Sequence, residues 1–160
     1  MDVTFRVALC RRVNVALADL AGHKDLVDEA VYYFRSNVFF SSFEMKGPAD
    51  RVLVYLTVFM QLCLVRAVDE GRRGQPAVMT ALNALAAATP AVSGEAGFLV
   101  PGPFYTAPAE AEREDLRAYL KQLRAALVPR LVEIIFDESG DVSKWWKQFA
   151  KLKFMQISTR

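Results

Sequence analysis

The longest apolar run in the chain extends from Val52 to Val65, and only Thr57 and Gln61 within it are clearly polar. The first five residues of the run are all apolar. At about 100° per residue they sweep through more than one full helical turn, so a helix here would leave no face for water. The pattern therefore predicts an apolar central helix at about residues 48–70, surrounded by other helices.

Two other structures for this run fit less well. A membrane span needs about 20 apolar residues, whereas this run has fourteen and is closed by Arg51 and Arg66. A β-strand usually has about 5–6 residues, and no turn residue interrupts the run. Gly47 and Pro48 precede it, and this pair is typical of a helix start. We therefore expect a buried helix and no transmembrane segment.

Apolar residues at three- and four-residue spacing predict further helices around the central one. They fall at about residues 25–40, 76–87, 109–136 and 143–155. Pro129 lies inside the third of these and is expected to kink or divide it. The sequence thus predicts an all-α single domain, residues 1–160, of four to six helices. Apolar and polar residues alternate near the start, so residues 1–24 are expected to include an extended segment.

Aromatic side chains extend the apolar stripe of the helix at 25–40 around its surface and beyond its end. These residues are Tyr32, Tyr33, Phe39, Phe40 and Phe43. A stripe of this kind is more often core than a ligand site. We therefore expect the cluster to pack against the central helix.

An irregular connection is predicted at about residues 89–108, where proline and glycine are frequent. Loops of this length inside a compact domain usually cross a surface as a strap. This one contains the apolar residues Phe98, Leu99, Val100, Phe104 and Tyr105. We expect them to hold the strap against the core.

Composition and charge narrow the class of protein. Apolar residues make up 53% of the chain, which suggests apolar surface reserved for a partner. The formal net charge of +2 is too small to favour nucleic acid. Cys10 and Cys63 form neither a disulfide framework nor a metal-ligand spacing, as expected of reduced residues in a cytosolic protein. The N-terminal apolar run is too short for a secretory signal, so a cytoplasmic location is expected.

The sequence contains no recognisable arrangement of catalytic residues. His23 is the one histidine, and no cysteine or carboxylate stands at metal-ligand spacing from it. The glycine pairs at 71–74 and 94–97 lack a phosphate-loop pattern. Glu114 and Asp115 lie at the solvated start of a helix, where neither is desolvated. The sequence therefore predicts no enzyme activity, no cofactor and no metal.

The C-terminal segment contains the one cluster that resembles a functional surface. From Ser143 to Arg160 it has several lysines and aromatic residues and no acidic residue. Tryptophan is enriched where interfaces contribute energy, and lysines suit an acidic partner. The alternative is a terminal helix that buries its aromatic residues and exposes solubilising lysines. The candidate interface residues are Lys144, Trp145, Trp146, Lys147, Lys151 and Lys153.

Adjacent tryptophans on a helix point about 100° apart. Trp145 and Trp146 therefore need not share one environment, and one can belong to the core while the other contacts a partner. A basic terminal helix also suits a membrane surface, which would give salt-sensitive binding to liposomes.

Several segments together resemble subunit 3 of the actin-related protein 2/3 complex, the assembly that nucleates branched actin filaments. They occur in the family's order: DLVDEAVYYFRSNVFF (Asp25 to Phe40), ADRVLVYLTVF (Ala49 to Phe59), GEAGF (Gly94 to Phe98), YTAP (Tyr105 to Pro108), RAYLKQLR (Arg117 to Arg124) and SKWWKQFAKLKFM (Ser143 to Met155). Residues 1–24, the Arg72-Arg73 loop and Pro129 depart from the family's pattern.

The resemblance implies a helical, non-catalytic subunit that supports actin nucleation and branching at the cell cortex. Its implied partners are actin-related protein 3, the other subunits of the complex and the actin filament. Two alternatives stay open from the residues alone. One is a small helical carrier of an apolar ligand, with a cavity beside Tyr55, Phe59 and Met60, and the other is a helical adaptor in a different cytosolic assembly.

Overall fold

The computed structural model describes residues 25–39, 44–100 and 105–157. Within these ranges the α-helices are α2 (Leu26–Asn37), α3 (Pro48–Glu70), α4 (Gln75–Ala87), α5 (Glu110–Ile135) and α6 (Lys144–Phe149), with short 3-10 helices η1 (Gly71–Arg73) and η2 (Phe154–Gln156). Extended pairing in the described ranges is limited to one bridge between Phe136 and Val142. The all-α prediction is confirmed. The extended segment expected within residues 1–24 lies outside the described residues.

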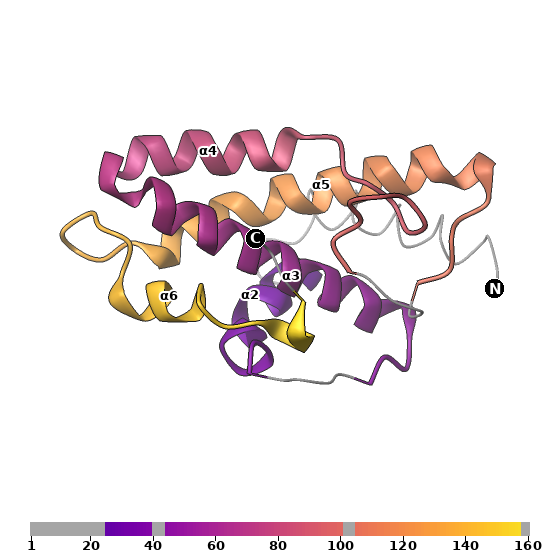
Figure 1. Ribbon diagram of the computed structural model, residues 1–160, viewed down its shortest axis with the longest axis horizontal. Coiled ribbons are helices and arrows are strands. Elements are labelled where there is room, and N and C mark those ends of the chain that lie inside the picture. Colours follow the sequence, from indigo (N-terminus) through magenta and orange to yellow (C-terminus); the bar gives the residue numbers. More distant parts are fainter. Residues whose placement is uncertain (1–24, 40–43, 101–104, 158–160) are drawn as a thin grey trace.

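Helix α3 crosses the middle of the molecule and contacts α2, α4, α5 and α6 (Figure 1). The eight residues from Val54 to Gln61 are all buried, and at 100° per residue they point in every direction around the axis. The prediction of an enclosed central helix is therefore confirmed for its middle. On either side of this stretch the enclosure is partial, because Val52, Leu62 and Val65 are only half-buried.

The start of α3 has the predicted chemistry. The carboxylate of Asp50 accepts hydrogen bonds from the backbone N–H groups of Lys46 (2.9 Å) and Gly47 (2.8 Å), ahead of Pro48. At its other end α3 stops at Glu70, and Gly71 is its C-terminal cap. Gly71 keeps a right-handed conformation and begins η1, and the chain turns at Gly74, where φ is +86°. Only glycine adopts that conformation without strain.

By length and composition, Pro48–Arg73 is apolar enough to cross a membrane. However, 61% of its most apolar window is buried inside the protein. The core helix of a globular domain has the same composition, because it exchanges water for neighbouring side chains on all sides. Packing against the other helices therefore accounts for the hydrophobicity of this segment.

Pro129 does not divide α5, which runs as one helix from Glu110 to Ile135 (Figure 1). A proline inside a helix removes the hydrogen bond to the carbonyl four residues earlier, here that of Ala125. Ala125 and Pro129 are both exposed, so water can reach the freed carbonyl. The buried residues on the opposite face, among them Leu127 and Leu131, keep the helix on the core. Of the two outcomes expected from the sequence, division of the helix is therefore wrong.

Replacing Pro129 with alanine is expected to stabilise the protein by about 1–3 kcal/mol, since proline inside a helix costs about 3 kcal/mol and its effect on the unfolded chain offsets part of this. Urea denaturation of the purified protein measures the change. Pro76→Ala is the matched control, because Pro76 lies in the first turn of α4, where proline is well tolerated, and no comparable gain is expected. An unchanged or lower midpoint for Pro129→Ala would contradict this account.

The strap between α4 and α5 is held against the core, as predicted. The ring of Phe98 stacks on Tyr55 at a centroid distance of 5.9 Å and meets the edge of Tyr105 at 5.1 Å. The hydroxyl of Tyr105 donates to the carbonyl of Arg51 (2.6 Å), and Val100 is fully buried. Phe104 lies outside the described residues.

An arginine on α5 fixes the other end of the strap. The guanidinium of Arg117 binds the carboxylate of Glu95 (3.0 and 3.2 Å) and the carbonyl of Pro90 (2.9 Å). The hydrogen bond from Arg117 and that from the Val92 N–H lower the pKa of Glu95. The strap is therefore part of the rigid framework on which the rest of the surface is arranged.

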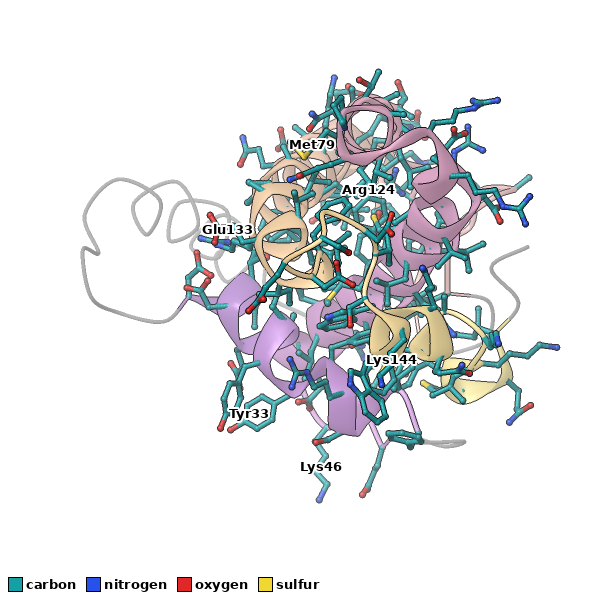
Figure 2. The ribbon with its side chains drawn as sticks, turned by 90° about the vertical axis from the view of Figure 1, so that its left-hand side faces the viewer. Tyr33, Lys46, Met79, Arg124, Glu133 and Lys144 are labelled. Atoms are coloured by element: carbon teal, nitrogen blue, oxygen red, sulfur yellow. The ribbon has the colours of Figure 1, made fainter. Side chains whose placement is uncertain are left out.

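The aromatic cluster of α2 does not pack as predicted. Phe34 is fully buried, but Tyr32 is 66% exposed, Tyr33 46% and Phe39 67%. Figure 2 shows Tyr33 pointing away from the protein. The buried residues of α2 fall every three or four positions, so Tyr32 lies on the opposite side of the helix and Tyr33 lies at the edge of the buried stripe. The expectation that these three residues form core is wrong, and Phe40 and Phe43 lie outside the described residues.

A buried charge joins α5 to α3. The Nε of Arg124, which is 6% exposed, donates to the hydroxyl of Tyr55 at 2.8 Å, and its guanidinium lies 4.8 Å from the ring centre of Phe59. Figure 2 shows Arg124 inside the helical bundle. Burial raises the pKa of Tyr55 despite the nearby charge, so its hydroxyl stays neutral and accepts the bond. These contacts fill the space beside Tyr55 and Phe59.

Candidate protein interface

A tight turn after α5 sets the direction of the C-terminal segment. One carboxylate oxygen of Asp137 accepts hydrogen bonds from the N–H groups of Ser139 (3.0 Å) and Asp141 (3.2 Å). The hydrogen bond from the Ser139 side chain is the main cause that lowers the pKa of Asp137. The N–H of Ser143 then donates to the carbonyl of Ile135 (2.8 Å), which closes the turn and brings the chain back toward α3.

The last helix is much shorter than the predicted segment from Ser143 to Met155. Helix α6 ends at Phe149, a turn follows, and Met155 and Gln156 have positive φ angles of 49° and 59°. The side chain of Gln61 explains the ending. Its Nε2 donates to the carbonyl of Leu152 and its Oε1 accepts from the N–H of Phe154 (3.2 Å). Leaving the helical path also buries Phe154 and Ile157 against the core.

Gln61→Ala is expected to cost about 1–3 kcal/mol, because it removes the hydrogen-bond partners of the partly buried Leu152 carbonyl and of the buried Phe154 N–H. Amide hydrogen exchange should become faster in residues 150–157 before it changes in α3. Gln148→Ala is the control, since Gln148 is exposed on α6. Unchanged exchange at Phe154 in the Gln61→Ala protein would show that Gln61 does not anchor this segment.

The two tryptophans lie in different environments, as their spacing predicts. Trp146 is 4% exposed, and its ring stacks on Phe34 at 6.0 Å with the guanidinium of Arg35 5.3 Å away. Trp145 is 66% exposed, and its ring lies 5.4 Å from the Nζ of Lys144. Trp146 therefore belongs to the core and Trp145 to the surface.

The remaining candidate residues are all exposed: Lys144, Lys147, Lys151 and Lys153. Together with Trp145 they form what we call the basic face of the C-terminal segment. This segment is attached to the core by Trp146, which stacks on Phe34, and by Gln61, which binds the backbone at Leu152. The sequence did not reveal the part played by Gln61, although its position as a polar residue within an apolar helix was a signal.

Two surface hollows lie beside α6, and neither borders Tyr55, Phe59 or Met60. All three of those side chains are at most 1% exposed. The structure thus gives the predicted ligand cavity no support, because the space beside these residues is filled by packed side chains.

The amino-acid sequence is similar to those of a known protein family. The family is described as P21-Arc: ARP2/3 complex ARPC3 (21 kDa) subunit, and its sequence profile matches residues 9–159 of this chain. The chain is 41% identical to actin-related protein 2/3 complex subunit 3 of Arabidopsis thaliana over 133 residues, which cover 83% of this chain and 75% of the relative. It is 38% identical to the Schizosaccharomyces pombe subunit 3, over 82% of this chain and 74% of that relative.

The probable subunit 3 of Caenorhabditis elegans is 36% identical, over 82% of this chain and 72% of that protein. The family match also includes residues 9–24, which the motifs quoted above do not cover. These matches cover most of the sequence, and the observed helical fold around one apolar helix is the fold that the resemblance implied. The chain belongs to the family of ARP2/3 complex ARPC3 (21 kDa) subunits.

Proposed function

We propose that this chain is a non-catalytic structural subunit of the actin-related protein 2/3 complex and supports actin filament nucleation and branching. Membership of the ARPC3 family supports this, as do relatives named for that complex in a plant, a nematode and a yeast. In this role the fold acts as a rigid support, and its surface residues make the contacts.

The observation that carries the proposal furthest is the exposure of Trp145 next to the buried Trp146. An indole ring exposed among lysines has no packing partner in the core, whereas a partner protein would desolvate it. The segment is held at Trp146 and at Gln61, so Trp145 is presented in a fixed position. Fixing the surface before binding lowers the entropy lost on association.

The partner that suits the basic face has an acidic surface with an apolar pocket for Trp145. We assign this contact to the actin-related protein 3 subunit, and expect the complex to place the chain in the cytoplasm at the actin-rich cortex. Contact with the actin filament itself belongs to the same proposal.

The test is recovery of actin-related protein 3 on a tagged copy of the full chain. Trp145→Ala is expected to lower recovery more than Lys151→Ala, because desolvated aromatic residues contribute more than charges at the rim. Tyr33→Ala is the matched control, since it removes an exposed aromatic side chain from α2. Recovery by Trp145→Ala equal to that of the unmodified chain would contradict the assignment.

A further inference from the structure

A groove runs between the C-terminal part of α3 and helix α6. One hollow, of about 300 Å³, is lined by residues of both helices, and a second of about 660 Å³ continues toward η1 and the 137–142 turn. The two hollows share Val68, Asp69 and Lys147, so they form one surface feature, here called the α3–α6 groove.

The apolar part of the groove comes from the central helix. Val65 and Val68 line it and are half-buried, although the middle of α3 is enclosed on all sides. Ala150 adds to the apolar lining. Toward its C-terminal end α3 thus exposes part of two valine side chains in this hollow, where they are available to an apolar group of a partner.

The α6 side of the groove is positively charged. It is lined by Lys144, Lys147 and Lys151, and none of these lysines forms an ion pair within the described part of the chain. Asp69 lines the α3 side, and Asp141 lies at the far end. Cations on one side and carboxylates on the other favour a single orientation of an incoming charged segment.

We infer that the α3–α6 groove receives an acidic amphipathic helix from the same subunit that contacts the basic face, an inference that rests on the proposed function. Lys144 and Lys147 are three residues apart on α6, so they lie on the same side of that helix. A helix with carboxylates three or four residues apart places them on one face toward the lysines. An apolar residue between them meets Val65 and Val68.

Zero-length crosslinking of the purified, assembled complex tests this inference, because a carbodiimide joins a lysine only to a carboxylate in direct contact. The expected products join Lys147 or Lys151 to an aspartate or glutamate of another subunit. Products within this chain alone, such as Lys147 to Asp69, would overturn the inference while leaving the proposed function intact. Failure of the complex to copurify would overturn both.

The double variant Lys147→Gln, Lys151→Gln gives a second readout. It is expected to weaken incorporation into the complex by about tenfold or more, as loss of charge pairs at an interface does. Lys46→Gln with Lys121→Gln is the matched control, since both lysines are exposed away from the groove. Urea midpoints of all variants should agree, and equal incorporation of the two double variants would overturn the inference.

Binding to phosphatidylserine vesicles tests whether the partner of the groove is a protein or a membrane surface. The assembled complex is expected to show no vesicle binding that depends on Lys147 and Lys151, because the neighbouring helix already covers them. Vesicle binding by the assembled complex that disappears in the double variant would overturn the inference in favour of a membrane.

Discussion

Replacing Leu56 with aspartate is expected to unfold the domain. Leu56 is fully buried at the middle of α3, where neighbouring helices surround it. Loss of the leucine side chain alone costs about 2–5 kcal/mol, and burial of an unpaired carboxylate adds several more. Domains of this kind are stable by only about 5–15 kcal/mol, so little or no stability would remain.

Circular dichroism and urea denaturation of the purified protein check this result. Ile134→Asp is the matched control, because it makes the same kind of change at an exposed position of α5, which is 37% exposed. The control protein is expected to stay folded. A soluble and cooperatively folded Leu56→Asp protein would show that α3 is not the centre of the core.

Replacing the two tryptophans with alanine is expected to have very different effects on stability. Trp146→Ala is expected to destabilise the protein by about 3–5 kcal/mol, because it leaves a cavity beside Phe34 and releases α6 from the core. Trp145→Ala is expected to change stability by no more than about 0.5 kcal/mol, as substitutions at exposed positions do. Any loss of complex assembly in Trp145→Ala then comes from a lost contact.

Urea denaturation of both variants measures the difference, with Trp146→Phe as a control that fills part of the cavity. The Phe variant should regain part of the stability that Trp146→Ala loses. Equal stability of the two alanine variants would contradict the placement of one tryptophan in the core and the other at the surface.

The sequence predicted the core of this fold because the core depends on local patterns. Residues 52–65 are too apolar for a surface helix and are closed at both ends by an arginine, so the pattern favoured burial inside a helical domain over a membrane span. The strap was predicted for the same kind of reason, since a free linker does not carry aromatic residues such as Phe98 and Tyr105.

The failures occurred where distant contacts override local patterns. The helical periodicity continues through Phe154, yet hydrogen bonds from Gln61, more than ninety residues earlier, draw the chain away after Phe149. Pro129 breaks a local rule, but it faces solvent while its helix is held by packing on the other side. The exposure of Tyr32 follows from which face of α2 meets the core, a choice that composition alone does not fix.

The candidate interface was predictable as a group of residues but not as a surface. The sequence indicated six residues, and the structure divides them into five at the surface and one, Trp146, in the core. The division depends on which side of α6 meets Phe34. The groove beside it was not predictable, since it joins residues of α3 to lysines about eighty positions later in the chain.

The central claim is that this chain works as a structural subunit of the actin-related protein 2/3 complex. Mass spectrometry of the proteins that copurify with a tagged copy of the full chain tests it most directly. The account predicts recovery of both actin-related proteins together with the other small subunits of the complex. Purification of the folded chain without any of them would contradict it.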